Sequence, residues 1–329
     1  MQALTMTEPS PGADRTEVRK VEEPRPGPGE VTIDVAYAGI NFMDVMARRG
    51  DPGYASGWPF TPGLEVSGTV REVGPGFSAL AEGQPVVAYT PGGGLAEVVR
   101  TRAEFALPLP DRVPLPVAAA APLLLTTALL LLTDAARFRP GDSVLVHSAG
   151  GGVGSAIAQL VPALGGGLRI GTVGRPDKVV ATRSSGYDVA VARTEDVAAA
   201  VRAATNGAGA DIVLDPHGTA LLDLDLALTA PAGRIVLFGN AGGGEQAPLP
   251  PVTRLIAGNL AIGGFSISRL WAGAPHRASA GLRRVLDLIA DGRLDVPVTE
   301  VASLAEVPRV QQLLAEGRGR GKYVAQVAG

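Results

Sequence analysis

The sequence contains no cysteine and only three histidines, His147, His217 and His276. The absence of cysteine excludes disulfides, iron–sulfur clusters, cysteine-ligated zinc and a thiol nucleophile. Positive charge is also not in excess, because 29 Lys and Arg against 32 Asp and Glu give a formal net charge of -3. Nucleic-acid-binding proteins carry a basic surface, so this balance argues against that class. Hydrophobic residues make up 46% of the chain, which is typical of a globular protein.

Long apolar runs are also missing. The most apolar stretch, residues 117–132, is too short to span a bilayer comfortably, and Pro122 interrupts it. It predicts a buried helix. Residues 1–15 are polar and lack a signal-peptide pattern. We therefore expect a soluble, cytoplasmic protein, and the length of 329 residues favours two domains.

The first part of the chain, up to about residue 116, is rich in predicted strands. Residues 31–37 and 66–73 alternate between apolar and polar side chains with period two. Clusters of Gly and Pro separate such runs, as turns do. Many short strands joined by Gly/Pro turns predict a small barrel or sandwich.

The pattern changes near Pro116, where strands begin to alternate with helices. Strands are predicted at 143–147, 167–173, 189–192, 211–214 and 234–238, and helices at 155–161, 178–184, 196–204 and 220–228. This alternation predicts a parallel sheet covered by helices on both faces. The tail adds a strand at 259–265, helices at 278–291 and 305–316, and a last strand at 322–327 that can return to the first domain.

A glycine-rich loop lies between the first strand and the first helix of this alternating region. Its residues are Ala149, Gly150, Gly151, Gly152, Val153 and Gly154. Glycines allow a tight turn and close approach of a pyrophosphate, which the N-terminus of the next helix attracts. The loop therefore predicts dinucleotide binding, with a plain structural turn as the alternative.

The residues at the end of the second strand indicate which dinucleotide the chain would bind. NAD sites usually have an acidic residue there, but this chain has Gly174 and Arg175, followed by Lys178. A guanidinium or ammonium group pairs with a 2′-phosphate, whereas a carboxylate would repel it. We therefore predict NADPH as the cofactor. Alternatively, Arg175 and Lys178 form a solvated helix start.

Several motifs, taken in order, resemble one family. They are Gly39-Ile40-Asn41-Phe42-Met43-Asp44, Pro62-Gly63-Leu64-Glu65-Val66-Ser67-Gly68, Arg139-Pro140-Gly141-Asp142, the stretch from Val146 to Gly154, and Gly321-Lys322-Tyr323-Val324. Over nearly its whole length the chain resembles a zinc-free medium-chain dehydrogenase/reductase of the quinone oxidoreductase and enoyl reductase branch. The resemblance implies an α/β fold with a GroES-like β-barrel domain, residues 1–120 completed by 262–329, and a Rossmann doubly wound parallel-sheet domain, residues 121–261. It also implies a homodimer.

The resemblance further implies a metal-free reduction. Zinc-dependent relatives have His between Gly and Glu and use cysteine ligands, whereas this chain has Gly63-Leu64-Glu65 and no cysteine. Hydride addition from NADPH to a quinone or an α,β-unsaturated carbonyl compound is favoured, because a conjugated acceptor is already polarised. Alternatives are a specialised biosynthetic enoyl reductase or reductive cyclase, and an NADPH-binding protein without catalysis.

Site residues follow from the same resemblance. Asn41 and Asp44 are expected to shape the active-site cleft, and Thr127 to contact the nicotinamide amide. Relatives often have Tyr at the position of Met46 and near Pro52, so Tyr54 is the nearest candidate for a proton donor, with solvent as the alternative. The structural alternatives are a backbone hydrogen bond for Asn41, a helix N-terminal carboxylate for Asp44, and a bond within a helix for Thr127.

Further cofactor contacts are implied beyond the glycine-rich loop. Arg193 stands where relatives often place a Tyr near the 2′-phosphate, and it is either a phosphate ligand or a surface arginine. The remaining implied contacts, largely through backbone, are Phe238, Gly239, Phe265, Ser266 and Lys322. His217 is expected to be a loop residue without a role, and the alternative is that it lines the cofactor cleft. Trp58, Phe60 and Trp271 either line an apolar pocket or pack in a core.

Overall fold

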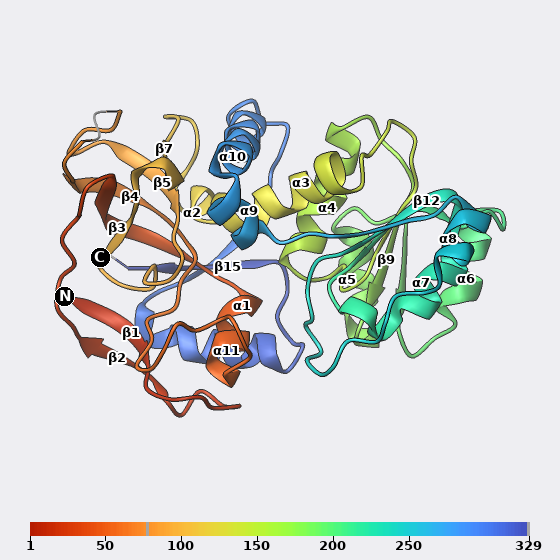
Figure 1. Cartoon of the computed structure of the whole chain (residues 1–329), viewed down its shortest axis with the longest axis horizontal. Coiled ribbons are helices and arrows are strands. Elements are labelled where there is room, and N and C mark those ends of the chain that lie inside the picture. Colours follow the sequence, from red (N-terminus) through yellow and green to blue (C-terminus); the bar gives the residue numbers. More distant parts are fainter. Residues whose placement is uncertain (77–78, 328–329) are drawn as a thin grey trace. The chain divides into compact units, whose positions relative to one another are not determined.

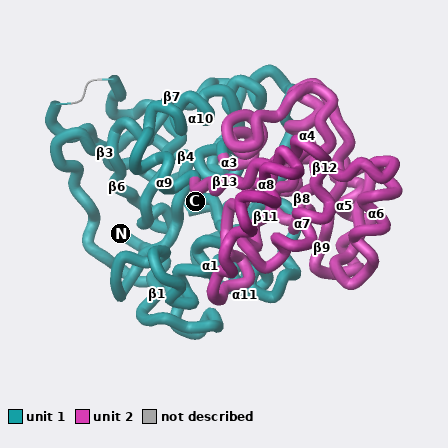
Figure 2. Tube along the Cα trace, turned by 45° about the vertical axis from the view of Figure 1, so that its right-hand side comes forward, with its two compact units in different colours: residues 1–126, 267–329 teal, residues 127–266 magenta. Residues whose placement is uncertain are grey.

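The computed structural model describes residues 1–76 and 79–327. It divides into two compact units, Met1–Thr126 with Ile267–Gly329 (unit 1) and Thr127–Ser266 (unit 2) (Figure 2). The sequence placed the boundaries after residues 120 and 261. In the structure the first boundary lies after residue 126, and Glu65 of unit 1 binds the backbone of residues 123 and 124. The second boundary lies after residue 266, because the strand at Ala261–Gly264 pairs with the sheet of unit 2.

Unit 1 is built on a mainly antiparallel sheet, in which strands from the first part of the chain pair with the C-terminal strand, whereas β14 and β15 run parallel. Its strand order is β14-β15-β3-β4-β5-β7, and β6 also pairs with β3 (Figure 1). The bounds are β3 Glu30–Ile40, β4 Glu65–Val73, β5 Pro85–Tyr89, β6 Val98–Arg102, β7 Ala106–Pro108, β14 Val298–Val301 and β15 Lys322–Gln326. A separate hairpin pairs β1 (Gln2–Met6) with β2 (Thr16–Lys20). The helices are α1 Phe42–Arg49, α2 Leu115–Ala118, α9 Ile267–Gly273, α10 Pro275–Ala290 and α11 Val307–Ala315.

The alternation in the sequence explains the core of unit 1. Along β3, Val31, Ile33 and Val35 are buried whereas Asp34 is exposed, as the period of two requires. β15 pairs antiparallel with β3, so the last strand of the chain lies beside one of the first. This pairing brings Lys322, at the start of β15, to the end of β3.

Unit 2 is a doubly wound parallel sheet with the strand order β10-β9-β8-β11-β12-β13. The strands are β8 Val144–Val146, β9 Arg169–Val173, β10 Val189–Ala192, β11 Ala210–Asp215, β12 Thr229–Leu237 and β13 Ala261–Gly264. The helices are α3 Thr126–Leu130, of which Thr126 belongs to unit 1, α4 Gly152–Ala163, α5 Val179–Ser184, α6 Val197–Ala204, α7 Leu222–Leu228 and α8 Val252–Gly258. All five pairings are parallel. The order reverses between β8 and β11, and ligands of such sheets bind at that switch point.

The apolar run at 117–132 does not form one continuous helix, which corrects the sequence prediction. It consists of α2, a π-helical turn at Ala121–Leu125, α3 and a second π-helical turn at Leu131–Ala135. Pro122 has no backbone N–H, and the Glu65 carboxylate accepts the next two N–H groups, so the regular α-helical bonding is interrupted. The run is buried as expected. Among the described residues, no helix is long and apolar enough to cross a membrane.

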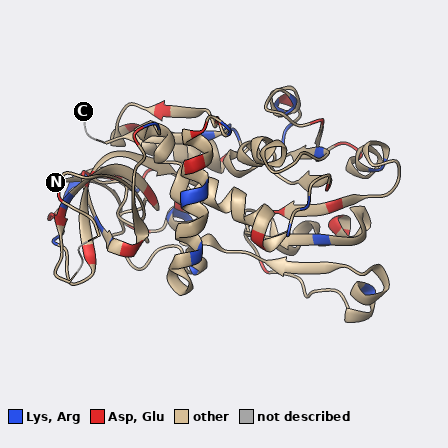
Figure 3. Ribbon diagram, turned by 90° about the horizontal axis from the view of Figure 1, so that it is seen from above, with Lys and Arg blue, Asp and Glu red and all other residues tan. Residues whose placement is uncertain are grey.

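Charged residues of both signs are interspersed along the chain (Figure 3). This distribution agrees with the near balance of 29 basic and 32 acidic residues. Most of the ion pairs join exposed side chains, so each contributes little to stability. Among residues 1–76 and 79–327, the His147–Asp225 and Lys322–Glu65 contacts are buried instead, and they are described with the candidate site.

Candidate functional site

The glycine-rich loop of unit 2 connects β8 to α4. Gly151 is the N-cap of α4, and a Cβ on it would lie 3.2 Å from the Ser148 carbonyl oxygen. A Cβ on Gly154 would lie 2.4 Å from the Ala149 carbonyl oxygen, closer than real Cβ atoms approach. Glycine at position 154 therefore lets the first turn of α4 pack directly on the loop, and the N-terminus of α4 begins at this loop. This geometry fits a pyrophosphate cradle.

A cluster of polar side chains lies at the carboxyl ends of the neighbouring strands. The Arg193 Nη1 atom, after β10, is 3.0 Å from His217 Nε2, and Ser148 Oγ is 2.9 Å from the same nitrogen. A Cβ on Gly174, after β9, would lie 2.8 Å from Arg193 Nη2. The guanidinium therefore occupies the space that a side chain at position 174 would take.

His217 was expected to be a loop residue without a role, and the structure shows that its ring contacts Arg193 and Ser148. Burial, and then Arg193 and His147, lower the pKa of His217 to about 4. Its imidazole is therefore neutral at pH 7, and Nε2 can accept a hydrogen bond from the Arg193 guanidinium. The sequence could not show this contact, because it joins residues after two different strands.

The other predicted cofactor residues of unit 2 differ in their exposure to solvent and in their position relative to the strands. Arg175 is exposed and its Nε atom lies 3.0 Å from Asp177 Oδ1. Lys178 ends a short 3₁₀ turn, and a Cβ on Gly150 would lie 3.8 Å from its Cδ. The remaining residues are buried Thr127 on α3, and two pairs that follow strands: Phe238 and Gly239 after β12, and Phe265 and Ser266 after β13.

A buried polar group supports the same end of the sheet. His147 follows β8, and its ring nitrogens are 2.8 Å from Thr172 Oγ1 and 2.8 Å from Asp225 Oδ1. All three side chains are essentially inaccessible to solvent. Burial, and then the neighbouring Asp225, raise the pKa of Asp215 to about 7. The hydrogen bonds of His147 connect the end of β8 to β9 and to helix α7 inside unit 2.

Asn41, Glu65 and Lys322 form a buried network in unit 1. The Lys322 ammonium donates hydrogen bonds to Glu65 Oε1 (2.5 Å), Asn41 Oδ1 (2.8 Å) and the Ile40 carbonyl (3.0 Å). Asn41 Nδ2 donates to Glu65 Oε1 at 3.0 Å. Lys322 is 1% exposed, so its side chain is not accessible to a cofactor, and only a backbone contact stays a prediction. Sequence reasoning assigned no role to Glu65, although this residue lies in the family-like motif of residues 62–68.

Asp44 holds the start of α1. Its Oδ2 atom accepts the Asn41 N–H at 2.8 Å, and its Oδ1 atom accepts the Gly63 N–H at 3.2 Å. These contacts match the structural alternative, in which Asp44 is a carboxylate at the N-terminus of a helix. Burial raises the pKa of Asp44 to about 6, against the opposing effect of these backbone bonds and Lys322.

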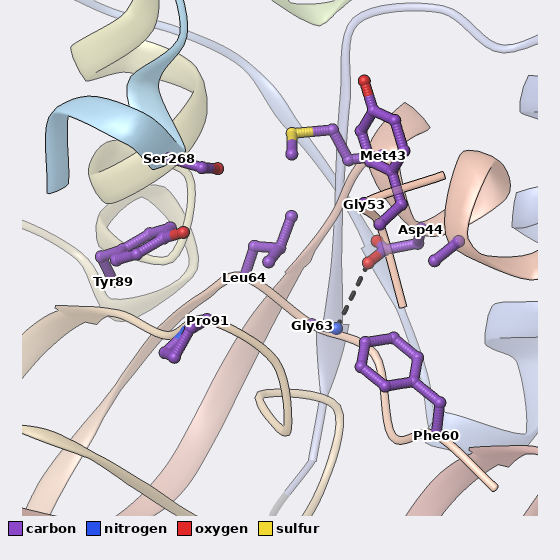
Figure 4. A pocket seen from close by; sticks show the side chains of 11 residues that line it. Met43, Asp44, Gly53, Phe60, Gly63, Leu64, Tyr89, Pro91 and Ser268 are labelled. Carbon is purple, nitrogen blue, oxygen red and sulfur yellow. Dashed lines mark hydrogen bonds between the residues drawn. The ribbon is translucent and has the colours of Figure 1, made fainter. Parts of the chain in front are cut away.

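Asp44 also lines a pocket of unit 1 with a volume of about 100 Å³ (Figure 4). Most of the lining is apolar or glycine, and Tyr54 is part of it. The full lining is Met43, Asp44, Ala47, Gly53, Tyr54, Phe60, Gly63, Leu64, Tyr89, Pro91 and Ser268. Tyr89 and Ser268 were not found by sequence reasoning. Phe60 lines the pocket, whereas Trp271 is fully buried in the core.

Two family models and several known proteins match this chain. Residues 27–111 match the alcohol dehydrogenase GroES-like domain, and residues 152–290 match the zinc-binding dehydrogenase model. A Pseudomonas aeruginosa quinone oxidoreductase is 32% identical over 323 residues, which cover 95% of this chain and 96% of that protein. The chain belongs to the medium-chain dehydrogenase/reductase family. Membership of this family confirms the two-domain fold and makes the protein an oxidoreductase.

Two further similarities concern other members of the medium-chain dehydrogenase/reductase family. The structure of Escherichia coli quinone oxidoreductase complexed with NADPH has a TM-score of 0.89 and 25% identity, covering 99% of this chain and 100% of that one. A pikromycin polyketide synthase component of Streptomyces venezuelae is 34% identical over 277 residues. This match covers 83% of the present chain but 7% of that protein.

Leu64, which stands between Gly63 and Glu65, lines the pocket. Among residues 1–76 and 79–327, no three His, Asp or Glu side chains are grouped so that they could hold a metal ion.

Proposed function

We propose that this protein transfers hydride from NADPH to a quinone or an α,β-unsaturated carbonyl compound without zinc. The observation that carries the proposal is the position of the Arg193 guanidinium at the carboxyl end of β9, beside Gly174. In NAD-binding members of this fold a carboxylate stands at the end of this strand. A guanidinium in its place favours a 2′-phosphate.

The residues of unit 2 fit such a cofactor. The loop from Gly150 to Gly154 and the N-terminus of α4 would hold the pyrophosphate. Arg193, Arg175 and Lys178 would contact the 2′-phosphate, and each offers a cationic group at the β9 and β10 ends of the sheet. NADPH supplies the hydride when it is bound. The relative from Escherichia coli, whose structure is described as an NADPH complex, supports this assignment.

The pocket of unit 1 suits a conjugated acceptor. Its lining is dominated by Met43, Leu64, Phe60 and other apolar groups, which exclude water from a reacting carbonyl. A Lewis acid is not required, because conjugation already polarises the acceptor. Leu64 in place of histidine and the absence of cysteine support a reaction without zinc. Asn41 and Asp44 would shape the pocket by fixing the start of α1.

We also propose a homodimer that forms through the β13 edge of the unit 2 sheet. β13 is the last strand in the order, and Ala261, Gly263 and Gly264 are exposed. Val252 and Ile256 of α8, which precedes β13, are 65% and 69% exposed. An open strand edge with apolar neighbours favours pairing with a second copy. Sedimentation of the intact protein and of an Ile256→Glu variant tests this, and a monomeric wild type would contradict it.

The central experiment measures the consumption of NADPH and NADH with 1,4-benzoquinone, 9,10-phenanthrenequinone and 2-cyclohexen-1-one. We expect turnover with NADPH. Dissociation constants for both nicotinamides, from their fluorescence, should differ by at least about threefold, or roughly 0.7 kcal/mol. A smaller difference would refute the choice of NADPH. Tight binding of NADPH with no consumption of any acceptor would favour a specialised substrate or a non-catalytic role.

An Arg193→Ala variant isolates the cofactor contact. Loss of a charge-assisted hydrogen bond costs about 1.5–3 kcal/mol, so the affinity for NADPH should fall roughly 10- to 150-fold. The affinity for NADH should stay unchanged, because it lacks the 2′-phosphate. Arg202→Ala, an exposed arginine on α6, is the matched control. Equal losses for both nicotinamides would contradict the assignment of Arg193.

A further inference from the structure

The pocket of unit 1 contains four polar side chains, and their contacts distinguish them. They are those of Asp44, Tyr54, Tyr89 and Ser268. Both carboxylate oxygens of Asp44 accept backbone N–H groups at the start of α1 and in the loop before β4. Asp44 is therefore used to hold the backbone. The hydroxyl groups are left as the donors that an acceptor molecule could meet.

Tyr89 is held rigidly at the end of β5. Its ring stacks on Trp271 with the centroids 5.3 Å apart and an angle of 2° between the planes. Phe105 packs against it edge-on at 5.6 Å. Thr101 donates a hydrogen bond to the Tyr89 carbonyl at 2.9 Å. The phenol, which is 4% exposed, is thus fixed before any substrate binds.

Helix α9 supplies both the support and a second hydroxyl. Trp271 and Ser268 are three residues apart, and such residues lie on the same face of a helix. In Figure 4 the Tyr89 and Ser268 oxygens point into the pocket, toward Leu64. By hydrogen-bond geometry the buried Ser268 Oγ atom has no partner among the described residues, although it lies close enough to the Tyr89 phenol to lower the pKa of that group. A buried hydroxyl without a partner is costly, so it calls for an explanation in terms of a ligand.

We propose that the Tyr89 and Ser268 hydroxyls hold the carbonyl oxygen of the acceptor and stabilise the negative charge that this oxygen gains during reduction. The inference rests on the proposed function and adds catalytic residues to it. Donors that are fixed before charge develops contribute strongly to catalysis in a dry site. Burial raises the pKa of Tyr89, although Ser268 acts in the opposite direction. The phenol therefore keeps its proton at neutral pH and stays a donor.

An unsaturated ketone is reduced in two steps, hydride addition and then protonation. The β-carbon forms a C–H bond with the hydride that NADPH supplies, and NADP⁺ is the oxidised product. The electron pair of the C=C bond moves between the α-carbon and the carbonyl carbon, and the carbonyl pair moves to oxygen. The two hydroxyls donate hydrogen bonds to this oxyanion. A water molecule then protonates the α-carbon, the carbonyl re-forms, and hydroxide is released.

The test compares variants that each remove a single hydroxyl. Tyr89→Phe keeps the ring and its stacking, and Ser268→Ala removes only Oγ. Tyr54→Phe tests the phenol that the sequence favours, and Tyr37→Phe on β3, outside the pocket, is the matched control. For each protein, kcat and KM for 2-cyclohexen-1-one, the NADPH dissociation constant and the melting temperature are measured.

We expect kcat to fall roughly 100-fold in Tyr89→Phe and in Ser268→Ala, the effect of losing one oxyanion donor. NADPH affinity and the melting temperature should match those of wild type, and the effects of the double variant should be less than additive. A kcat for Tyr89→Phe above about one third of the wild-type value would overturn the inference. So would a loss seen in Tyr54→Phe alone. A wild type that reduces no acceptor would instead refute the proposed function, and this inference with it.

Discussion

Replacing Lys322 with methionine tests the buried network of unit 1 most directly. The ammonium group donates to three oxygens, those of Glu65, Asn41 and Ile40. Lys322 is 1% exposed and Glu65 is 0% exposed, so neither charge is solvated by bulk water. Methionine has a similar length and can fill the space of the alkyl chain. The Lys322→Met variant therefore removes the charge and its hydrogen bonds but little of the packing.

The expected loss is large because the partner carboxylate stays behind. Removing one member of a buried ion pair costs about 3–5 kcal/mol, since the remaining charge is buried without compensation. For a domain of 150–250 residues, each kcal/mol lowers the melting temperature by about 2–4 °C. We therefore expect a decrease of roughly 6–20 °C for the transition of unit 1.

The assay is thermal and urea unfolding of wild type, Lys322→Met and a control, Lys20→Met. Lys20 is exposed at the end of β2, so its replacement should change the free energy of unfolding by at most about 0.5 kcal/mol. A Lys322→Met variant within about 1 kcal/mol of wild type would refute the argument. The folded variant should also bind NADPH within about threefold of wild type. A selective loss of binding would show that the Lys322 side chain serves the cofactor after all.

Three other predictions follow from particular contacts. Gly151→Val should abolish NADPH binding, because its side chain would fill the cradle and press on the Ser148 carbonyl, 3.2 Å from the Cβ position. Retained binding in a nicotinamide fluorescence titration would contradict the cradle. Asp225→Ala should lower the free energy of unfolding by about 2–5 kcal/mol, because it leaves His147 buried without this partner. Asp223→Ala, with an exposed side chain on the same helix, is its control, and similar urea midpoints for both variants would contradict the prediction. Asp44 should make stability depend on pH, because its pKa rises from 3.8 to about 6 on folding. The folded state then binds the proton more tightly, so a contribution of about 3 kcal/mol is present below pH 4 and is lost as the pH rises through about 6. Asp44→Asn should lack this dependence between pH 4 and 7, and parallel pH profiles of the two proteins would count against it.

Sequence reasoning was most successful where one physical factor dominates. The buried parallel strands of unit 2 are continuous apolar runs, and Val189–Ala192 was predicted with the bounds that the structure shows. Prediction was less successful where residues distant in sequence decide the outcome. The apolar run 117–132 breaks into α-helical and π-helical turns partly because Glu65, about 58 residues earlier, binds its backbone. Helix α9 was not predicted, although it supplies Ser268 and Trp271.

The candidate site shows the same division. The glycine-rich loop from Ala149 to Gly154 was visible because glycine spacing is a local requirement of the turn and of the helix that follows it. Tyr89 was not visible, because an aromatic residue at a strand end is typical of a core. Only the ring contacts with Trp271 and the direction of its hydroxyl make it a candidate donor. The contact of His217 with Arg193 became apparent only in the structure for the same reason.

The sequence by itself determined the two-part organisation, the parallel sheet and the glycine-rich loop, because hydrophobic period and backbone freedom are properties of neighbouring residues. Tertiary structure alone decided that Lys322 pairs with Glu65, across 257 positions of the chain. It also decided which polar side chains line the pocket. A side chain's partner depends on which strands the fold places side by side, and a buried charge takes whichever opposite charge that arrangement brings within hydrogen-bond distance.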